Sequence, residues 1–147
     1  MRAEILNFKL QADNDKEYTL NDFKGKNILL YFYPKDDTPG CTTQACDFTR
    51  LYDMYEKAGY TIIGVSKDSP NSHLKFKNKY QLKHLLLSDP ELILHKEFCT
   101  YGEKKLYGKT VQGVIRSTFL IDNDLTIIKE FKNVRAKGHA ERILKEL

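Results

Sequence analysis

The 147-residue chain has few cysteines and no long apolar run. A chain of this length buries roughly two thirds of its unfolded surface, so its three cysteines are not needed as a disulfide scaffold. No apolar run approaches the roughly 20 residues of a membrane-spanning helix, which excludes a membrane protein. With 41% hydrophobic and 30% charged residues, the composition is that of a globular protein.

The chain also lacks a strong charge and a secretory signal. The net charge is only +4, and residues of both signs are interleaved along the chain. We therefore expect no nucleic-acid partner, and we interpret the lysines between Lys75 and Lys79 as the solvated face of a helix above buried Phe76 and Tyr80. The first seven residues contain no apolar core followed by small residues, so no signal peptide is visible and a reducing, cytoplasmic location is expected.

Continuous apolar runs alternate with amphipathic stretches, which is typical of an α/β fold whose strands are buried on both faces. Residues 28–33 and 61–66 predict two such strands. The helix predicted between them ends at Gly59, where a left-handed cap is expected, and its apolar positions recur at three- and four-residue steps: Ala45, Phe48, Tyr52, Tyr55 and Ala58. This βαβ unit predicts that the two strands are parallel.

The rest of the chain predicts further elements of the same fold. We expect a helix over 71–80, a strand over 85–87, a short helix over 91–98, and a surface loop over 100–112. Residues 115–121 and 125–131 predict an antiparallel hairpin joined by 122–124, and a helix over 138–147 closes the chain. No linker or repeat interrupts this order, so we expect a single domain over 1–147. The expected fold is thioredoxin-like, a central mixed sheet flanked by helices with an amino-terminal extension over 8–26.

The most informative segment is 31–46, which predicts a strand, a loop and the start of a helix. Thr38 is a favoured N-cap residue and Pro39 suits the first helical position, which places Cys41 in the first turn. A thiolate at this place meets unpaired backbone N–H groups and the positive end of the helix dipole, and both favour the ionised sulfur. The dipole alone contributes only about 0.3–1 kcal/mol at an exposed site, so a second cation is needed for a large effect.

Arg116 is the best candidate for that cation. It lies within residues 113–121, whose apolar character predicts a buried strand, and an unpaired guanidinium there would be strongly unfavourable. The residues alone leave two anions open as its partner: a carboxylate in a structural ion pair, or the Cys41 thiolate. In a thioredoxin-like fold the later strand lies beside the first strand, which brings Arg116 toward the start of the Cys41 helix and favours the sulfur.

The spacing of Cys41 and Cys46 is also informative. Five residues along a regular helix give a rise of ~7.5 Å and place the Cα atoms roughly 8.7 Å apart on opposed flanks. A disulfide needs Cα atoms within about 7 Å. If these cysteines pair, the first turns of the helix have to unwind, and the weak helix formers Gly40, Thr42 and Thr43 ease that change. The chain has no Cys-x-x-Cys pair, which would close without such a disruption.

The pattern Pro34-x-x-x-Thr38-x-x-Cys41, with a second cysteine five residues later, resembles the active-site segment of peroxiredoxins. It is most similar to the bacterioferritin comigratory protein, or peroxiredoxin Q, subfamily. The likeness includes residues 20–26 and 116–122 and covers roughly 8–147 in total. Family members often have Pro-Asp-Phe where this chain has Leu6-Asn7-Phe8, a departure that affects no catalytic role.

The resemblance implies a role for each of five residues. Cys41 would be the peroxidatic nucleophile and Cys46 the resolving cysteine, Thr38 would hydrogen-bond the sulfur and the peroxide, Pro34 would shield the site, and Arg116 would polarise both reactants. The implied activity is a thiol-dependent peroxidase for hydrogen peroxide and organic hydroperoxides, with a sulfenic acid and an intramolecular Cys41–Cys46 disulfide as intermediates. Thioredoxin or a similar dithiol would restore both thiols. No metal, haem or flavin cofactor is required, and a monomer is expected.

Two other functions stay open on the residues alone. One is a non-enzymatic redox switch, in which unwinding alters a partner surface and no catalytic peroxide turnover occurs. The other is a disulfide reductase of the thioredoxin type, against which the missing Cys-x-x-Cys pair argues. Cys99 is interpreted as an unreactive thiol beside the expected loop. None of the four histidines stands at ligand spacing from a cysteine, so no zinc site is expected.

Overall fold

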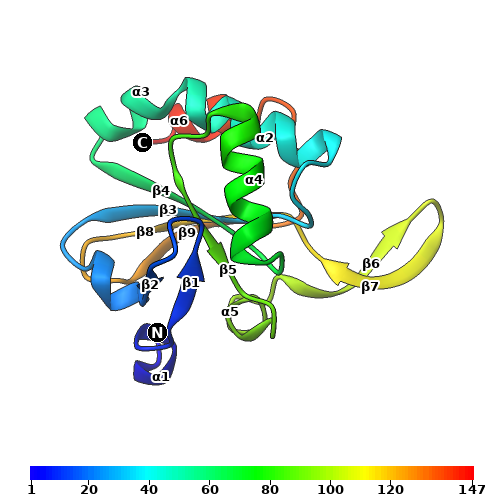
Figure 1. Ribbon diagram of the computed structural model, residues 1–147, viewed down its shortest axis with the longest axis horizontal. Coiled ribbons are helices and arrows are strands. Elements are labelled where there is room, and N and C mark those ends of the chain that lie inside the picture. Colours follow the sequence, from blue (N-terminus) through cyan, green and yellow to red (C-terminus); the bar gives the residue numbers. More distant parts are fainter.

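The computed structural model describes residues 1–147 and is built around a seven-stranded mixed sheet (Figure 1). The strands lie in the order β2-β1-β5-β4-β3-β8-β9. Their bounds are β1 (Leu10–Ala12), β2 (Glu17–Tyr18), β3 (Asn27–Phe32), β4 (Tyr60–Ser66), β5 (Leu85–Ser88), β8 (Ser117–Ile121) and β9 (Ile127–Phe131). β4 is parallel to both β3 and β5, whereas β8 is antiparallel to β3. The predicted α/β class with a central mixed sheet is therefore confirmed.

Helices cover both faces of the sheet (Figure 1). One face carries α2 (Pro39–Arg50), α3 (Tyr52–Lys57), α4 (Pro70–Tyr80) and α6 (His139–Leu144), and the other carries α1 (Ala3–Leu6), the 3-10 helix η1 (Leu20–Phe23) and α5 (Ile93–Glu97). Because side chains alternate along a strand, β3 supplies both cores: Leu29 and Tyr31 pack beneath α2, while Leu30 and Phe32 pack toward α5. None of these helices is long and apolar enough to cross a membrane.

The amino-terminal extension enlarges the sheet. β1 pairs antiparallel with β5, where Gln11 lies opposite Ser88, and β2 pairs antiparallel with β1 at the edge. The residues before β3 thus complete the side of the sheet farthest from β8 and β9.

The helix predicted between the first two parallel strands, starting after Thr38 and ending at Gly59, is two helices. α2 ends at Arg50, and Leu51 adopts φ −95° and ψ 6°, outside the helical range, before α3 begins at Tyr52. Leu51 is buried in the same core as Phe48, so the break coincides with a tertiary packing contact. The helical periodicity of the sequence does not reveal this contact. The expected left-handed conformation at Gly59 is confirmed by its φ of +86°.

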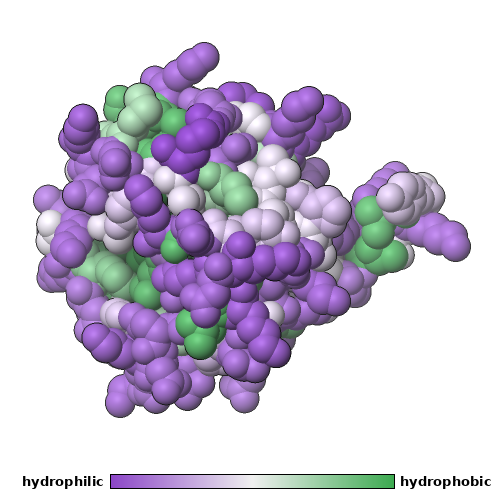
Figure 2. All heavy atoms as spheres, turned by 45° about the horizontal axis from the view of Figure 1, so that its top comes forward, coloured by the Kyte–Doolittle hydropathy of each residue, from purple (hydrophilic) through white to green (hydrophobic).

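The predicted surface loop over 100–112 is wrong, because this segment is a second sheet of two strands. β6 (Tyr101–Leu106) and β7 (Lys109–Val114) form an antiparallel hairpin that projects from the body of the molecule (Figures 1 and 2). Tyr107 and Gly108 turn the chain with φ of 52° and 77°, as in a two-residue hairpin turn. Of the residues in these two strands only Val114 is buried, so the sequence shows no alternation of apolar and polar residues.

The hairpin predicted over 115–131 is present, with shorter strands. Arg116 directly precedes β8 and is half-buried, and Leu125 belongs to the turn, where it adopts a φ of +65°. β9 therefore starts only at Ile127.

Candidate active site

Cys41 lies in the first turn of α2, as the sequence predicts. Thr38 occupies the N-cap position with an extended backbone, and Pro39 is the first residue of the helix. The first backbone hydrogen bond of the helix runs from the Thr42 amide to the Thr38 carbonyl at 2.8 Å, so the amides before Thr42 have no helical acceptor. The Cys41 side chain is 2% exposed and packs in the core beneath α2. Its sulfur therefore lies at the amino-terminal end of the helix, in a largely dehydrated place.

Thr38 does not cap the helix with its side chain. Its hydroxyl donates to the Lys35 carbonyl at 2.9 Å, within the loop that joins β3 to α2. The N-cap position was predicted correctly, but the hydroxyl is held by the loop. Both lone pairs of that oxygen remain available to a donor.

Arg116 reaches the sulfur of Cys41 across 75 residues of sequence. Its Nη2 donates to Cys41 Sγ at 3.3 Å, and its Nη1 donates to Gln44 Oε1 at 2.5 Å. The guanidinium forms no ion pair with an Asp or Glu side chain, so of the two anions left open by the sequence, the structure places the sulfur beside it. Gly40 leaves room for this approach, because a Cβ atom there would lie 3.2 Å from Arg116 Nη2.

Gln44 is a member of this cluster that the sequence reasoning missed. It lies three residues after Cys41, and positions i and i+3 share one face of a helix. It is fully buried, and its amide nitrogen has no hydrogen-bond partner. In the sequence, Gln44 is a single amide side chain among polar helix residues. Without the Arg116 contact it cannot be distinguished from a solvated side chain.

Cys46 lies in the same helix as Cys41, and both thiols are free. Cys46 is partly exposed. Its burial, followed by the nearby Asp47 carboxylate, raises the pKa of the Cys46 thiol, so this thiol remains protonated near neutral pH while α2 is folded. Cys99 is exposed and lies just after α5, in a left-handed conformation with φ 56°.

Pro34 lies half-buried in the loop directly after β3, and its shielding of Cys41 stays a prediction. Its neighbour Tyr33 is buried, and the Tyr33 hydroxyl donates to Asp36 Oδ1 at 2.6 Å. Burial, and next the Asp36 carboxylate, raises the pKa of Tyr33, so the phenol keeps its proton.

Two of the buried histidines lie near this site and are neutral. Burial, followed by Lys77, lowers the pKa of His84 to about 3, and its Nε2 lies 2.7 Å from the Tyr31 hydroxyl. Burial, followed by Arg142 and Arg116, lowers the pKa of His139 to about 4. Neither imidazole therefore supplies a positive charge to the sulfur, which leaves Arg116 as the cation bonded to it. No group of three or more His, Cys, Asp or Glu side chains is arranged to hold a metal ion.

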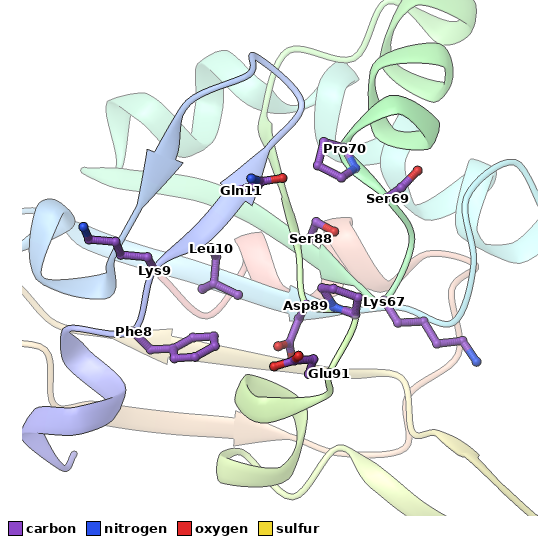
Figure 3. A pocket seen from close by; sticks show the side chains of 11 residues that line it. Phe8, Lys9, Leu10, Gln11, Lys67, Ser69, Pro70, Ser88, Asp89 and Glu91 are labelled. Carbon is purple, nitrogen blue, oxygen red and sulfur yellow. The ribbon is translucent and has the colours of Figure 1, made fainter.

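A pocket of about 310 Å³ lies away from the cysteines, between β1, β5 and the start of α4 (Figure 3). None of the predicted site residues lines it. Its most buried carboxylate, Asp89, is already bonded to His95, with Asp89 Oδ2 at 2.7 Å from His95 Nδ1. The pocket therefore lacks the nucleophile and the cation that come together at Cys41.

Comparison with known sequences gives matches over nearly the whole chain. The model of the AhpC/TSA family matches residues 1–130. Peroxiredoxin Bcp of Bacillus subtilis is 47% identical over 139 residues, which cover 95% of this chain and 88% of that protein. The putative peroxiredoxin bcp of Helicobacter pylori strain J99 is 43% identical over 140 residues, which cover 95% of this chain and 92% of that protein.

Solved structures of the same group share the fold. The bacterioferritin comigratory protein of Xanthomonas campestris superimposes with a TM-score of 0.93 at 37% identity, covering 99% of this chain and 93% of that one. A variant of Xylella fastidiosa PrxQ gives a TM-score of 0.93 at 38% identity, covering 99% of this chain and 91% of that one. The resemblance expected from the segment around Cys41 thus extends over the whole sheet and its helices, and the predicted thioredoxin-like fold is confirmed.

Proposed function

The chain belongs to the AhpC/TSA family, and from this premise we propose that it is a peroxidase whose Cys41 thiolate reduces hydrogen peroxide and organic hydroperoxides. The observation that carries the proposal is the 3.3 Å contact between Arg116 Nη2 and Cys41 Sγ at the first turn of α2. The relatives are named peroxiredoxins, and the structure from X. campestris is described by its alkyl peroxide reduction activity, which supports organic hydroperoxides as substrates.

In the proposed first step, the Cys41 thiolate attacks the terminal oxygen of the peroxide and the O–O bond breaks. The sulfur becomes a sulfenic acid, and the other oxygen leaves with the electron pair and takes a proton to give water or an alcohol. Arg116 and the unpaired amides of the first turn favour the thiolate and the charge that develops on the departing oxygen. The Thr38 oxygen accepts a hydrogen bond from the peroxide, and Pro34 limits the access of water.

In the proposed second step, the Cys46 thiol condenses with the sulfenic acid, releases water and forms an intramolecular disulfide. Both cysteines lie in one regular helix, where their separation is too great for a disulfide, so α2 has to unwind between them. The break between α2 and α3 at Leu51 limits how far the unwinding spreads. Unwinding also removes the burial that keeps the Cys46 thiol protonated.

In the proposed third step, a dithiol reductant such as thioredoxin attacks the Cys41–Cys46 disulfide and returns both residues to thiols by exchange. In the unwound segment both sulfurs are accessible to a second protein, whereas in the folded helix Cys41 is only 2% exposed. A reducing compartment, as expected from the sequence, supplies such a donor.

Turnover with thioredoxin, thioredoxin reductase and NADPH tests the proposal. We expect hydrogen peroxide to drive continuous NADPH oxidation with the unmodified chain and none with Cys41→Ser. Cys99→Ser is the matched control, because it removes an exposed thiol outside α2, and its turnover should equal that of the unmodified chain. Full turnover by Cys41→Ser would contradict the assignment, and oxidation that stops after one equivalent would favour a redox switch over an enzyme.

A further inference from the structure

A buried carboxylate of unassigned role lies in the loop between β3 and α2. Only 4% of the Asp36 side chain is exposed, and three donors converge on it. Its Oδ1 accepts from the Tyr33 hydroxyl at 2.6 Å, and its Oδ2 accepts from Ser72 Oγ at 2.8 Å and lies 2.7 Å from His73 Nδ1. The loop that ends at the Cys41 helix is thus bonded to the first turns of α4.

The contacts of His73 extend this connection to β5. His73 Nε2 lies 2.9 Å from the Leu87 carbonyl oxygen, and a carbonyl only accepts, so Nε2 carries a hydrogen. The other ring nitrogen, Nδ1, faces the Asp36 carboxylate, on which two hydroxyls also converge. The side chain of His73 is fully buried, so this buried pair joins the loop, α4 and β5.

The rest of the loop is fixed to the same helix. Asp37, which adopts a left-handed φ of 57°, accepts from Lys79 Nζ at 2.8 Å and from the Tyr80 hydroxyl at 2.7 Å near the other end of α4. The Asp36 amide donates to Asp68 Oδ2 at 2.8 Å, after the end of β4. Two consecutive residues of the loop are therefore held by α4, and the next residue is Thr38.

We propose that Asp36, held by His73, is a positioning residue of the peroxide site. It acts through the loop: it fixes where α2 starts, and so sets Thr38, the free amides of the first turn and Cys41 relative to Arg116. A buried polar pair contributes little net stability compared with apolar groups of the same shape, which makes a positional role a better account of this one. This inference rests on the proposed peroxidase function, because it concerns the alignment of that site.

A matched pair elsewhere in the chain separates positioning from stability. Asp89 and His95 are as buried as Asp36 and His73 and also approach to 2.7 Å, and Asp89 accepts from the Ile93 and His95 amides. This second pair lies at α5, where the His95 ring packs against Phe32 in the core on the sheet face opposite to Cys41. Asp89→Asn therefore imposes the same change on a similar buried Asp–His pair without touching the loop.

The experiment compares Asp36→Asn with Asp89→Asn by three measurements: the second-order rate of Cys41 oxidation by hydrogen peroxide, the rate of Cys41 alkylation by iodoacetamide, and urea unfolding. An amide keeps the shape of the carboxylate but replaces one acceptor oxygen by an NH2 donor. A donor that faces Asp36 then loses its acceptor, and the loop has to shift. We expect Asp36→Asn to slow the peroxide reaction about 10-fold and alkylation less than about 3-fold, because alkylation requires the thiolate but not its alignment with Thr38 and Arg116. Asp89→Asn should lower stability and leave both rates within about 2-fold.

Equal peroxide rates for the two variants, or an equal fall of both reactions in Asp36→Asn, would overturn the inference. If Asp36→Asn does not fold, Ser72→Ala and Tyr33→Phe each remove one donor and leave the Asp36–His73 contact. Each should slow the peroxide reaction about 2- to 5-fold without slowing alkylation. Unchanged peroxide rates in both would equally overturn it. An unmodified chain that is inert to peroxide would instead refute the proposed function.

Discussion

Substitution of Gly40 by alanine should make the protein more stable and less active. The backbone at Gly40 is not left-handed, so alanine suits it, and alanine is favoured over glycine in a helix by about 0.8–1.0 kcal/mol. The new Cβ would lie 3.2 Å from Arg116 Nη2 and 3.8 Å from Ala136 Cβ. The guanidinium has to move by a few tenths of an ångström, and its bond to Gln44 Oε1 at 2.5 Å restricts where it can go.

The magnitude follows from the hydrogen bond that is weakened. A hydrogen bond to a charged group contributes about 1.5–3 kcal/mol, which corresponds to a factor of roughly 10 to 150 in rate. Arg116→Met removes the contact and should slow Cys41 oxidation by about that factor. Gly40→Ala only displaces the guanidinium, so we expect a fall of about 3- to 10-fold, together with a gain of up to about 1 kcal/mol in the free energy of unfolding.

Stopped-flow oxidation by hydrogen peroxide and urea unfolding measure the two effects. Thr43→Ala is the matched control, because Thr43 is an exposed residue of the same helix and its replacement raises helix propensity without approaching Arg116. It should leave the peroxide step unchanged and slow disulfide formation, because the folded helix is stabilised against unwinding. Oxidation of Gly40→Ala at the rate of the unmodified chain, or an equal slowing in Thr43→Ala, would refute the reasoning.

Three further outcomes are expected. Cys46→Ser should keep the first oxidation at its normal rate but accumulate sulfenic and then sulfinic acid on Cys41, because no resolving thiol remains. Intact-mass spectrometry after excess peroxide measures the added oxygen atoms, and a mass without added oxygen would contradict this prediction. Between pH 7 and 5 the unfolded chain binds a proton at His84, whereas the folded chain does not, because its His84 pKa is about 3. The free energy of unfolding therefore decreases as the pH is lowered, and this residue accounts for about 2 kcal/mol of the loss at pH 5. His84→Gln, which retains a partner for the Tyr31 hydroxyl, should lose less stability over that range in urea titrations, and an identical loss would exclude this cause. Tyr107→Asn should slow amide exchange in the β6–β7 hairpin, because asparagine tolerates the left-handed φ of 52° at this turn position. Peroxide oxidation should stay unchanged, and faster amide exchange would contradict the turn assignment.

Much of the site was predictable because its key residues are local in sequence. The helix begins within four positions that contain Thr38, Pro39 and Cys41. The capping preferences of Thr38 and Pro39 alone therefore place the sulfur in the first turn. Arg116 was predictable for a different reason: a guanidinium among apolar strand residues needs an anion. Which anion it meets depended on the order of the strands, and the antiparallel pairing of β3 with β8 places Arg116 beside the loop after β3.

The features that were missed depend on contacts between distant residues. Gln44 bonds to Arg116 across 72 positions, and Asp36 lies against His73 across 37, so neither pair leaves a local pattern. The β6–β7 hairpin was missed because exposure of both its faces removes the apolar alternation that marks a strand. The break at Leu51 was missed because the apolar periodicity continues across it from α2 into α3.

The measurement that tests the central claim most directly is peptide mapping after one equivalent of hydrogen peroxide. Cleavage after lysine and arginine releases residues 36–50, which contain both Cys41 and Cys46, whereas Cys99 lies in the separate peptide 97–104. The account predicts that peptide 36–50 becomes two hydrogen atoms lighter, with its amides between Thr42 and Asp47 exchanging faster than before oxidation. A disulfide that joins the two peptides, or an oxidised chain in which peptide 36–50 is unchanged, would contradict it.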